Sequence, residues 1–170
     1  MPGILLPEIE RFAAAALERA GLCAADAEIV TASITHAHAH GKGTHGVGRL
    51  PIYLRKIAQG LMRADTPLTE ISAAPAMVLL DAAHGFGQVA AIRGMRRAVA
   101  MARDQGIGLV GIRHSNNFGT GAFIAAEAVA AGMAGIVMSN ASPAIAPTGG
   151  ARPVFGTNPV AFGMPGPAGG

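Results

Sequence analysis

The chain begins with segments in which apolar residues recur at helical spacing. The first runs from Pro7, which suits a first helical turn, to Gly21, which ends it. Asp26 is placed to cap a second helix that reaches a group of histidines. A third helix is predicted from near Pro51 to Gly60. The N-terminal part of the chain is therefore expected to be helical.

Further along, short apolar runs alternate with helical segments. The predicted strands cover 78–81, 107–112 and 135–138, the last two as buried strands, and the predicted helices cover 88–105 and 122–131. Gly106 closes the first of these helices. From Ser139 onward, Pro, Gly, Ser, Thr and Asn dominate, apart from a short apolar run at 160–162. This alternation predicts the α/β class with some parallel pairing, after an N-terminal helical segment.

Composition narrows the class of protein. The 170 residues are 51% hydrophobic and 14% charged, so the chain can bury a sizeable core and is not a disordered tail. The net charge is +3, and Lys and Arg form no stripe with interleaved aromatic residues, which argues against a nucleic-acid partner. The single cysteine, Cys23, excludes an intramolecular disulfide framework and fits a reducing compartment.

Two observations argue against a membrane or secreted protein. The most apolar stretch, 119–138, contains Glu127 and is broken by two glycines, whereas a bilayer span needs about 20 apolar residues. The start MPGILLPEIERF lacks the cationic region of a signal peptide. We therefore expect a cytoplasmic protein without a membrane partner.

Two glycine patterns resemble a dinucleotide fingerprint, which needs a strand before the glycines and a helix after them. At positions 106–111 the order is inverted, so a helix cap and a tightly packed strand are favoured. At positions 85–90 the order is right, but three residues lengthen the turn. A flexible start of the following helix is favoured there, and phosphate binding is the alternative.

Alternating histidines can bind zinc when a strand places their rings on one face. His36, His38 and His40 lie at the end of a predicted helix, where the first and third share a face and the second does not. No acidic residue occurs between Glu28 and Asp65 to complete a ligand set. No metal site is predicted, and a metal-dependent hydrolase is the weakest functional hypothesis.

His45 lies in a glycine-flanked loop, beside the Thr44 hydroxyl and four residues before Arg49. Reduction of a 2-oxo acid needs a proton donor at the carbonyl oxygen and a cation for the carboxylate, which a histidine and an arginine supply. From spacing alone, a surface-loop histidine explains the pattern equally well.

Two polar segments follow later in the chain. RHSNNFG at 113–119 joins a strand to a helix, where α/β proteins commonly bind ligands, although a polar turn with a helix cap is an equal alternative. GTNP at 156–159 reads by itself as an ordinary turn.

Taken together, five stretches resemble the second, non-Rossmann type of malate/L-lactate dehydrogenases, over essentially the whole chain. They are THGVGRLPIYLRKIAQG, GFGQVAA, GIGLVGIRHSNNFGTG, SNASPAIAPTGG and GTNPVAF. The family includes ureidoglycolate dehydrogenase, diketogulonate reductase, sulfolactate dehydrogenase and piperideine-2-carboxylate reductase. The resemblance implies NAD- or NADP-dependent reduction of a small 2-oxo acid, or oxidation of the 2-hydroxy acid, usually by a homodimer. Members are longer, so the chain would correspond to the N-terminal half.

The resemblance also implies roles for particular residues. His45 would donate the proton, Thr44 would replace the usual serine beside it, and Arg49 would bind the substrate carboxylate. Thr157 would contact the substrate. The residues implied to line the nicotinamide are His114, Ser115, Asn116, Asn117 and Phe118.

Asn117 departs from the family pattern, because many members carry a histidine there. An asparagine can form hydrogen bonds but cannot act as a general acid near neutral pH, so the proton donor is placed at His45. The implied division is a helical and α/β substrate and dimerisation region at 1–112, followed by the incomplete start of the NAD(P)-binding domain at 113–170. The competing hypothesis is a catalytically inactive fragment that associates through its apolar face.

Overall fold

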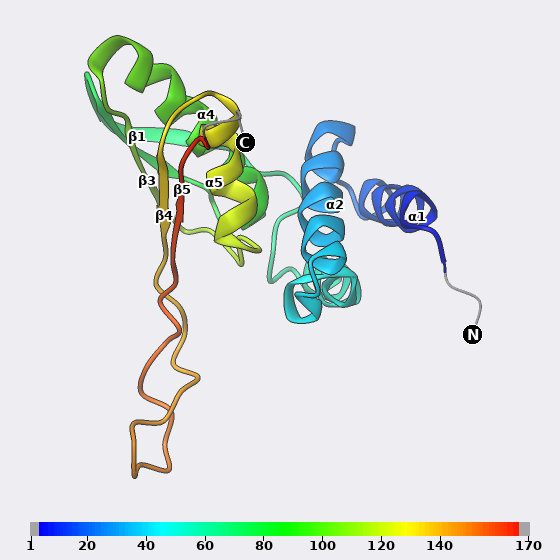
Figure 1. The fold of residues 1–170 in the computed structure, drawn as a ribbon. Helices are drawn as coiled ribbons and strands as arrows, with labels where there is room; N and C mark the ends of the chain where they lie inside the picture. Colours follow the sequence, from blue (N-terminus) through cyan, green and yellow to red (C-terminus); the bar gives the residue numbers. More distant parts are fainter. Residues whose placement is uncertain (1–3, 167–170) are drawn as a thin grey trace.

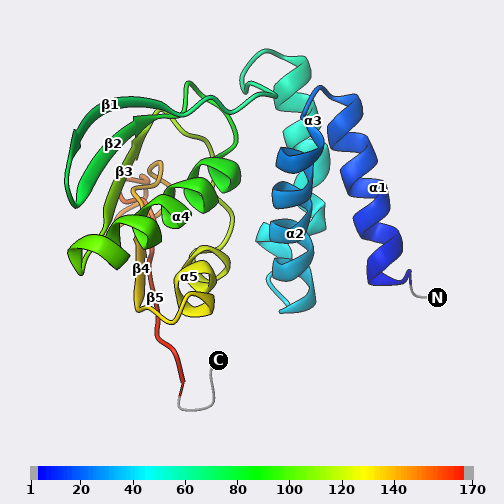
Figure 2. The same cartoon turned by 90° about the horizontal axis from the view of Figure 1, so that it is seen from above.

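The computed structural model describes residues 4–166. Three helices form one side of the molecule and lie apart from the strands (Figures 1 and 2). They are α1 (Leu6–Arg19), α2 (Ala24–Ala39) and α3 (Leu50–Ala58), and two short 3₁₀ turns, η1 (Gly43–His45) and η2 (Val47–Arg49), join α2 to α3. The three helices predicted from the apolar spacing are confirmed.

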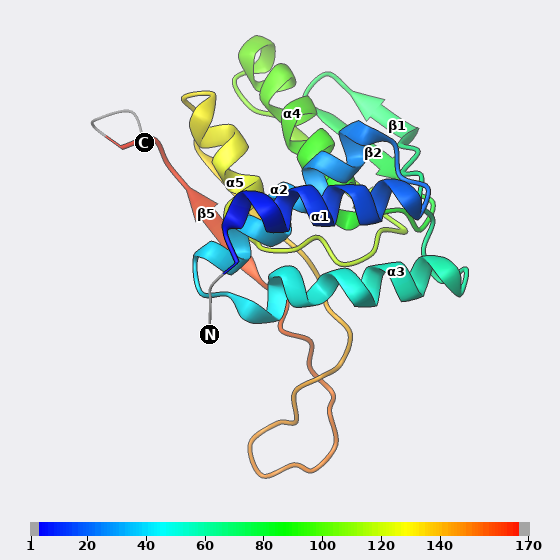
Figure 3. The same cartoon turned by 90° about the vertical axis from the view of Figure 1, so that its right-hand side faces the viewer.

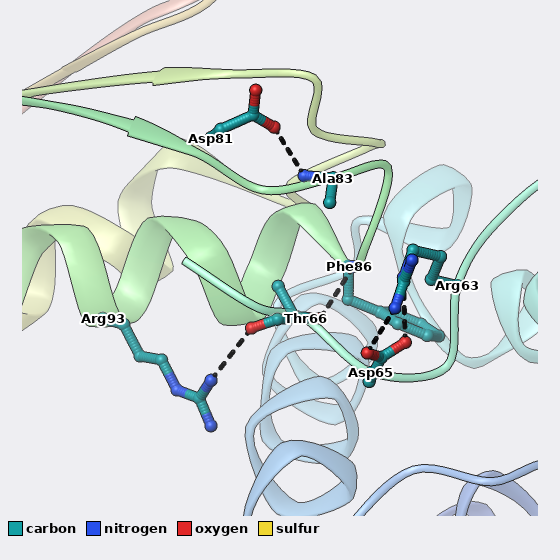
Figure 4. Close-up of polar contacts among 7 residues, drawn as sticks. All are labelled: Arg63, Asp65, Thr66, Asp81, Ala83, Phe86 and Arg93. Atoms are coloured by element: carbon teal, nitrogen blue, oxygen red, sulfur yellow. Dashed lines mark hydrogen bonds and ion pairs between the residues drawn. The ribbon is translucent and has the colours of Figure 1, made fainter. Parts of the chain in front are cut away.

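The predicted cap of α2 is wrong. Cys23 occupies the N-cap position without a side-chain hydrogen bond, and Asp26 lies within the first turn, where it is buried. Its carboxylate forms an ion pair with Arg93. The Arg93 guanidinium also donates a hydrogen bond to the Thr66 carbonyl (3.2 Å; Figure 4). Asp26 therefore fastens α2 to the strand-bearing part of the chain, a long-range role that local spacing does not reveal.

The helical core extends to the start of the next helix, α4 (Gly87–Gln105). Leu17, Val30 and Ile34 are fully buried between the helices. Phe86, immediately before α4, is also fully buried and meets the ring of Tyr53 edge-on, with centroids 5.6 Å apart. This aromatic contact fixes α3 against the start of α4.

The strands form two separate sheets. In the first, β1 (Thr69–Ala74) pairs antiparallel with β2 (Met77–Asp81), which pairs parallel with β3 (Leu109–Arg113) after the α4 crossover. In the second, β4 (Gly135–Met138) pairs antiparallel with β5 (Val160–Gly163), and α5 (Gly121–Ala130) packs against both strands. The predicted α/β class with some parallel pairing is confirmed. β1 was not predicted, because all six of its residues are exposed and show no apolar alternation.

Residues 139–159, between β4 and β5, project as a narrow arm (Figures 1 and 3). Ile145 and Phe155 exchange two backbone hydrogen bonds across it, of 2.9 and 3.0 Å. At its base, the Ala141 N–H donates to the side chain of Asn158 (2.9 Å). The polar turn predicted at 156–159 belongs to this base.

A cavity of about 540 Å³ lies between α4, β3, α5 and β4, and we call it the apolar groove. Gly106 ends α4 beside it in a left-handed conformation (φ 77°), as the sequence predicts. The prediction that β3 and β4 are buried is wrong: Leu109 is 53% exposed, and Ile136 and Met138 are 59% and 68% exposed. The reason is topological, since within residues 4–166 no strand pairs with the free edges of β3 and β4.

We expect the isolated 170-residue chain to self-associate, because exposed apolar side chains line these unpaired strand edges. Sedimentation velocity over a range of concentrations should show species larger than a monomer. The double substitution Ile136→Lys and Met138→Lys should reduce association. Leu61→Lys, an exposed position after α3 that lies in no strand and outside the groove, is the matched control and should not. A single monomeric species of the unmodified chain at every concentration would contradict the expectation.

Candidate active site

The structure brings Thr44, His45 and Arg49 together in the two 3₁₀ turns. The Thr44 hydroxyl oxygen lies 3.0 Å from Nδ1 of His45, and Nε of Arg49 donates to the Thr44 carbonyl (2.8 Å). Gly46, between the turns, is buried, and a Cβ there would lie 3.2 Å from the backbone of His38. Glycine thus lets the loop pack closely on the end of α2.

The surroundings of His45 set its protonation state. Partial burial, and then the nearby Arg49 charge, lower the pKa of His45 below its usual value of 6.5. The ring is therefore mainly neutral at pH 7. Nδ1 faces the Thr44 hydroxyl, so Nε2 is the ring nitrogen available to a ligand.

Tyr53 connects this loop to the segment at 113–119. Its hydroxyl donates to Oδ1 of Asn117 (3.1 Å) and accepts a hydrogen bond from Nε2 of the fully buried Gln88 (2.7 Å). Burial raises the pKa of Tyr53, and the Gln88 hydrogen bond and the Arg49 charge oppose that rise. Arg49 thus acts electrostatically on both His45 and Tyr53.

Sequence reasoning missed both Tyr53 and Gln88. A signal was present for the tyrosine, because it is the only one in the chain and follows Arg49 by one helical turn. Nothing in the sequence pointed to Gln88, since a single glutamine at the start of a helix is usually exposed to solvent.

Asp81, at the end of β2, anchors the start of the segment at 113–119. Its carboxylate accepts hydrogen bonds from the Ala83 N–H (2.8 Å; Figure 4), from Nε of Arg113 (2.9 Å) and from Nδ1 of His114 (2.9 Å). These bonds, with Ala83 and His114 foremost, lower the pKa of Asp81 to about 2. Ala83, His84 and His114 have φ angles of 46°, 63° and 49°, which non-glycine residues rarely adopt. The Asp81 hydrogen bonds hold this strained junction in place.

Asn116 and Gly87 make the remaining close contacts of this junction. Nδ2 of Asn116 donates to the His84 carbonyl (2.7 Å), and a Cβ on Gly87 would lie 2.1 Å from the Asn116 carbonyl oxygen. Gly87 therefore allows close packing against the segment at 113–119, and a Cβ on Gly85 would lie 2.8 Å from Thr66. Close packing on both sides explains these glycines, and the flexibility of the helix start stays a prediction.

The five residues predicted to line the cofactor face four different surroundings. His114 pairs with Asp81, and Asn116 holds the loop before α4. Asn117 faces Tyr53. The other two, Ser115 and Phe118, line the apolar groove.

Thr157, predicted to contact substrate, is exposed near the base of the arm. Among residues 4–166, no hydrogen bond connects it with Thr44, His45 or Arg49. Its role stays a prediction.

The other histidines lie where their spacing predicts. His36 and His40 share a face at the end of α2, with ring centroids 4.2 Å apart, and His38 lies beneath Gly46. In the part of the chain that the structure describes, no three His, Cys, Asp or Glu side chains are grouped closely enough to hold a metal ion. No described helix is long and apolar enough to cross a membrane.

Comparison with known proteins identifies the family. The sequence profile of the malate/L-lactate dehydrogenase family matches residues 4–170. The chain belongs to this family. Among its dehydrogenases, the (2R)-3-sulfolactate dehydrogenase (NADP(+)) of Chromohalobacter salexigens is 37% identical over 95% of this chain and 48% of its own length. The ureidoglycolate dehydrogenase (NAD(+)) of Escherichia coli O157:H7 is 34% identical over 87% of this chain and 42% of its own length.

The fold agrees with the family. The structure of malate dehydrogenase from Pyrococcus horikoshii OT3 superposes with a TM-score of 0.92 and 36% identity, over 95% of this chain and 47% of that one. The chain spans about half the length of the curated relatives that it matches, and it corresponds to their N-terminal half. The predicted division between residues 112 and 113 falls at the last residue of β3 and stays a prediction.

The low pKa of Asp81 predicts a pH dependence of stability. A carboxylate whose pKa falls from 3.8 to about 2 on folding stabilises the folded state above pH 4, and this contribution disappears as the pH falls toward 2. Asp81→Asn should therefore lower the free energy of unfolding at pH 7, by an amount that shrinks between pH 4 and pH 2. Urea unfolding at each pH measures it. Asp104→Asn, at the exposed end of α4, is the control, and a deficit independent of pH would contradict the expectation.

Proposed function

We propose that this chain forms the substrate-binding half of an oxidoreductase that transfers a hydride between NAD(P)H and a small 2-oxo acid, or the 2-hydroxy acid in reverse. The observation that carries the proposal is the grouping of Thr44, His45 and Arg49 within one loop, in a member of a dehydrogenase family. A guanidinium for the carboxylate and an imidazole for the carbonyl oxygen are the two groups that a 2-oxo acid requires.

In this proposal, each residue has one task. Arg49 binds the substrate carboxylate while its Nε stays on the Thr44 carbonyl. The Thr44 hydroxyl orients the His45 ring through Nδ1, so that Nε2 faces the substrate oxygen. His45 donates a proton to that oxygen as negative charge develops during reduction. In the oxidation direction the neutral ring accepts the proton, and the lowered pKa of His45 favours this form at pH 7.

The residues around the apolar groove fit the nicotinamide end of the cofactor. Phe118 offers a flat apolar surface there, and Ser115 a hydroxyl for the carboxamide group. The bound cofactor would supply or accept the hydride. Both NAD and NADP remain within the proposal, since the two relatives above are named for one and the other.

We further propose that the protein acts as a homodimer. Ile4, Leu5 and Phe12, in and before α1, are between 68% and 71% exposed and offer an apolar face for a second copy. The exposed Cys23 fits a reducing compartment and supports a cytoplasmic location. The exposed groove also favours the competing hypothesis of a non-catalytic chain that only associates with a partner.

A complementation assay distinguishes the proposed dehydrogenase from a chain that only associates with a partner. The chain is tested alone and joined to the second half of the Pyrococcus horikoshii malate dehydrogenase, with NADH or NADPH and a series of 2-oxo acids. We expect oxidation of the reduced cofactor that depends on the 2-oxo acid in the joined protein. A folded joined protein without turnover on any 2-oxo acid would contradict the dehydrogenase and favour the association module.

A further inference from the structure

We propose that Tyr53 and Gln88 are positioning residues that hold the side-chain amide of Asn117 as a fixed hydrogen-bond donor to the carbonyl oxygen of the substrate. The inference rests on the proposed function, because it concerns the same 2-oxo acid. It gives a task to Asn117, which cannot transfer a proton, and to two residues that the mechanism above does not use.

The orientation of the Asn117 amide follows from a backbone contact. The Gly119 N–H lies 3.2 Å from the side-chain atom assigned as Oδ1. A backbone N–H can only donate, so the atom facing it must be the oxygen and not the NH₂ group. The Tyr53 hydroxyl lies 3.1 Å from the same oxygen and must direct its proton there.

Gln88 is oriented by the same reasoning. Because the Tyr53 proton is committed to Asn117, the tyrosine oxygen can only accept from the glutamine, and Nε2 must be the atom 2.7 Å away. Gln88 is fully buried, so it cannot exchange this partner for bulk water. The result is a hydrogen-bond chain with one direction, from Gln88 through Tyr53 to Asn117.

Packing holds this hydrogen-bond chain rigid. Tyr53 is 3% exposed and rests edge-on against Phe86. Gly119 adopts a φ of 80°, and a Cβ there would lie 2.6 Å from the Ser33 hydroxyl. The glycine therefore lets the turn in which its N–H meets Asn117 pack closely against α2.

This orientation makes the NH₂ group of Asn117 the part of the amide that can bind a ligand. With Oδ1 engaged twice, Nδ2 of the half-buried Asn117 presents its N–H groups, and residues 4–166 supply no hydrogen-bond acceptor to them. Its partner Tyr53 lies in the first turn of α3, and Arg49, the proposed carboxylate ligand, is the N-cap residue of that helix. A donor fixed in advance stabilises charge that develops on a carbonyl oxygen without having to reorient. Asn117 would thus stabilise this oxygen while His45 supplies the proton.

The positioning is tested first without ligand. In ¹⁵N-labelled 170-residue chain, kept below the concentration at which it associates, the Asn117 side-chain NH₂ signals are identified by their loss in Asn117→Asp. Tyr53→Phe, which removes only the hydroxyl, should shift these signals, and Gln88→Met should shift them less. Thr35→Val is the matched control: it also removes a buried, hydrogen-bonded hydroxyl, but outside this site. Unmoved Asn117 signals in folded Tyr53→Phe would overturn the positioning role.

The donor role is tested with oxamate, a stable analogue of a 2-oxo acid. Oxamate should shift the Asn117 NH₂ signals of the unmodified chain. Its dissociation constant should rise about five- to tenfold in Tyr53→Phe, the effect of one weakened hydrogen bond, and more in Asn117→Asp, which keeps the acceptor and loses the donor. Equal affinity in all three proteins would overturn the donor role. If oxamate shifts no signal of the unmodified chain, the proposed substrate site itself is wrong, and the ligand-free comparison still decides the positioning role.

Discussion

Replacing His45 by alanine is expected to lower kcat by about 10² to 10⁴, the usual cost of losing a general acid or base. The effect should fall on kcat more than on the KM for the cofactor, because no described contact places His45 near Ser115 or Phe118. The physical reason is the charge that hydride transfer builds on the substrate oxygen. Without a proton donor, that charge must be carried by hydrogen bonds from neutral groups alone. Steady-state kinetics of the joined protein measure the change.

The pH profile makes this expectation specific to His45. Its pKa lies below 6.5, so reduction should speed up as the pH falls through that lowered value, and oxidation should speed up as the pH rises through it. Both dependences should vanish in His45→Ala. His40→Ala, at the exposed end of α2, is the matched control and should keep both. A His45→Ala protein with near-normal turnover, or with an unchanged pH profile, would place the proton donor elsewhere.

The grouping of the candidate catalytic residues could be predicted from the sequence because they are close together along the chain. Thr44, His45 and Arg49 span six positions, so glycine-induced turns suffice to bring them together. The helices could be predicted equally well, since apolar residues at helical spacing determine their buried faces. The resemblance of the short motifs to one family was also visible in the sequence, and the family match confirms that membership.

The features of the fold and the site that the sequence does not predict depend on contacts between residues far apart in the chain. Tyr53 and Asn117 are 64 positions apart, and Asp26 and Arg93 are 67 apart, so neither pair leaves a local pattern. Burial of the strands was misjudged for a related reason. An apolar run indicates which residues should avoid water, but the covering element decides whether they do, and no described segment covers the free edges of β3 and β4.

Arg49→Lys is expected to raise the KM for the 2-oxo acid by roughly tenfold to a hundredfold, while the KM for the cofactor stays nearly unchanged. Arginine can keep Nε on the Thr44 carbonyl and still present further N–H donors to a carboxylate. Lysine has one nitrogen, so it cannot hold the loop and bind the carboxylate with the same geometry. Loss of a hydrogen bond to a charged group is worth about 1.5–3 kcal/mol, which corresponds to this range.

Arg49→Gln distinguishes charge from geometry. The positive charge of Arg49 contributes to the low pKa of His45, and lysine keeps that charge whereas glutamine removes it. The pH profile should therefore move to higher pH in Arg49→Gln and stay close to the original in Arg49→Lys. A bound substrate carboxylate neutralises the same charge, so substrate binding should also raise the pKa of His45 and favour its protonated form for reduction. Equal losses of affinity for substrate and cofactor in both variants would instead assign Arg49 a purely structural role in holding the loop.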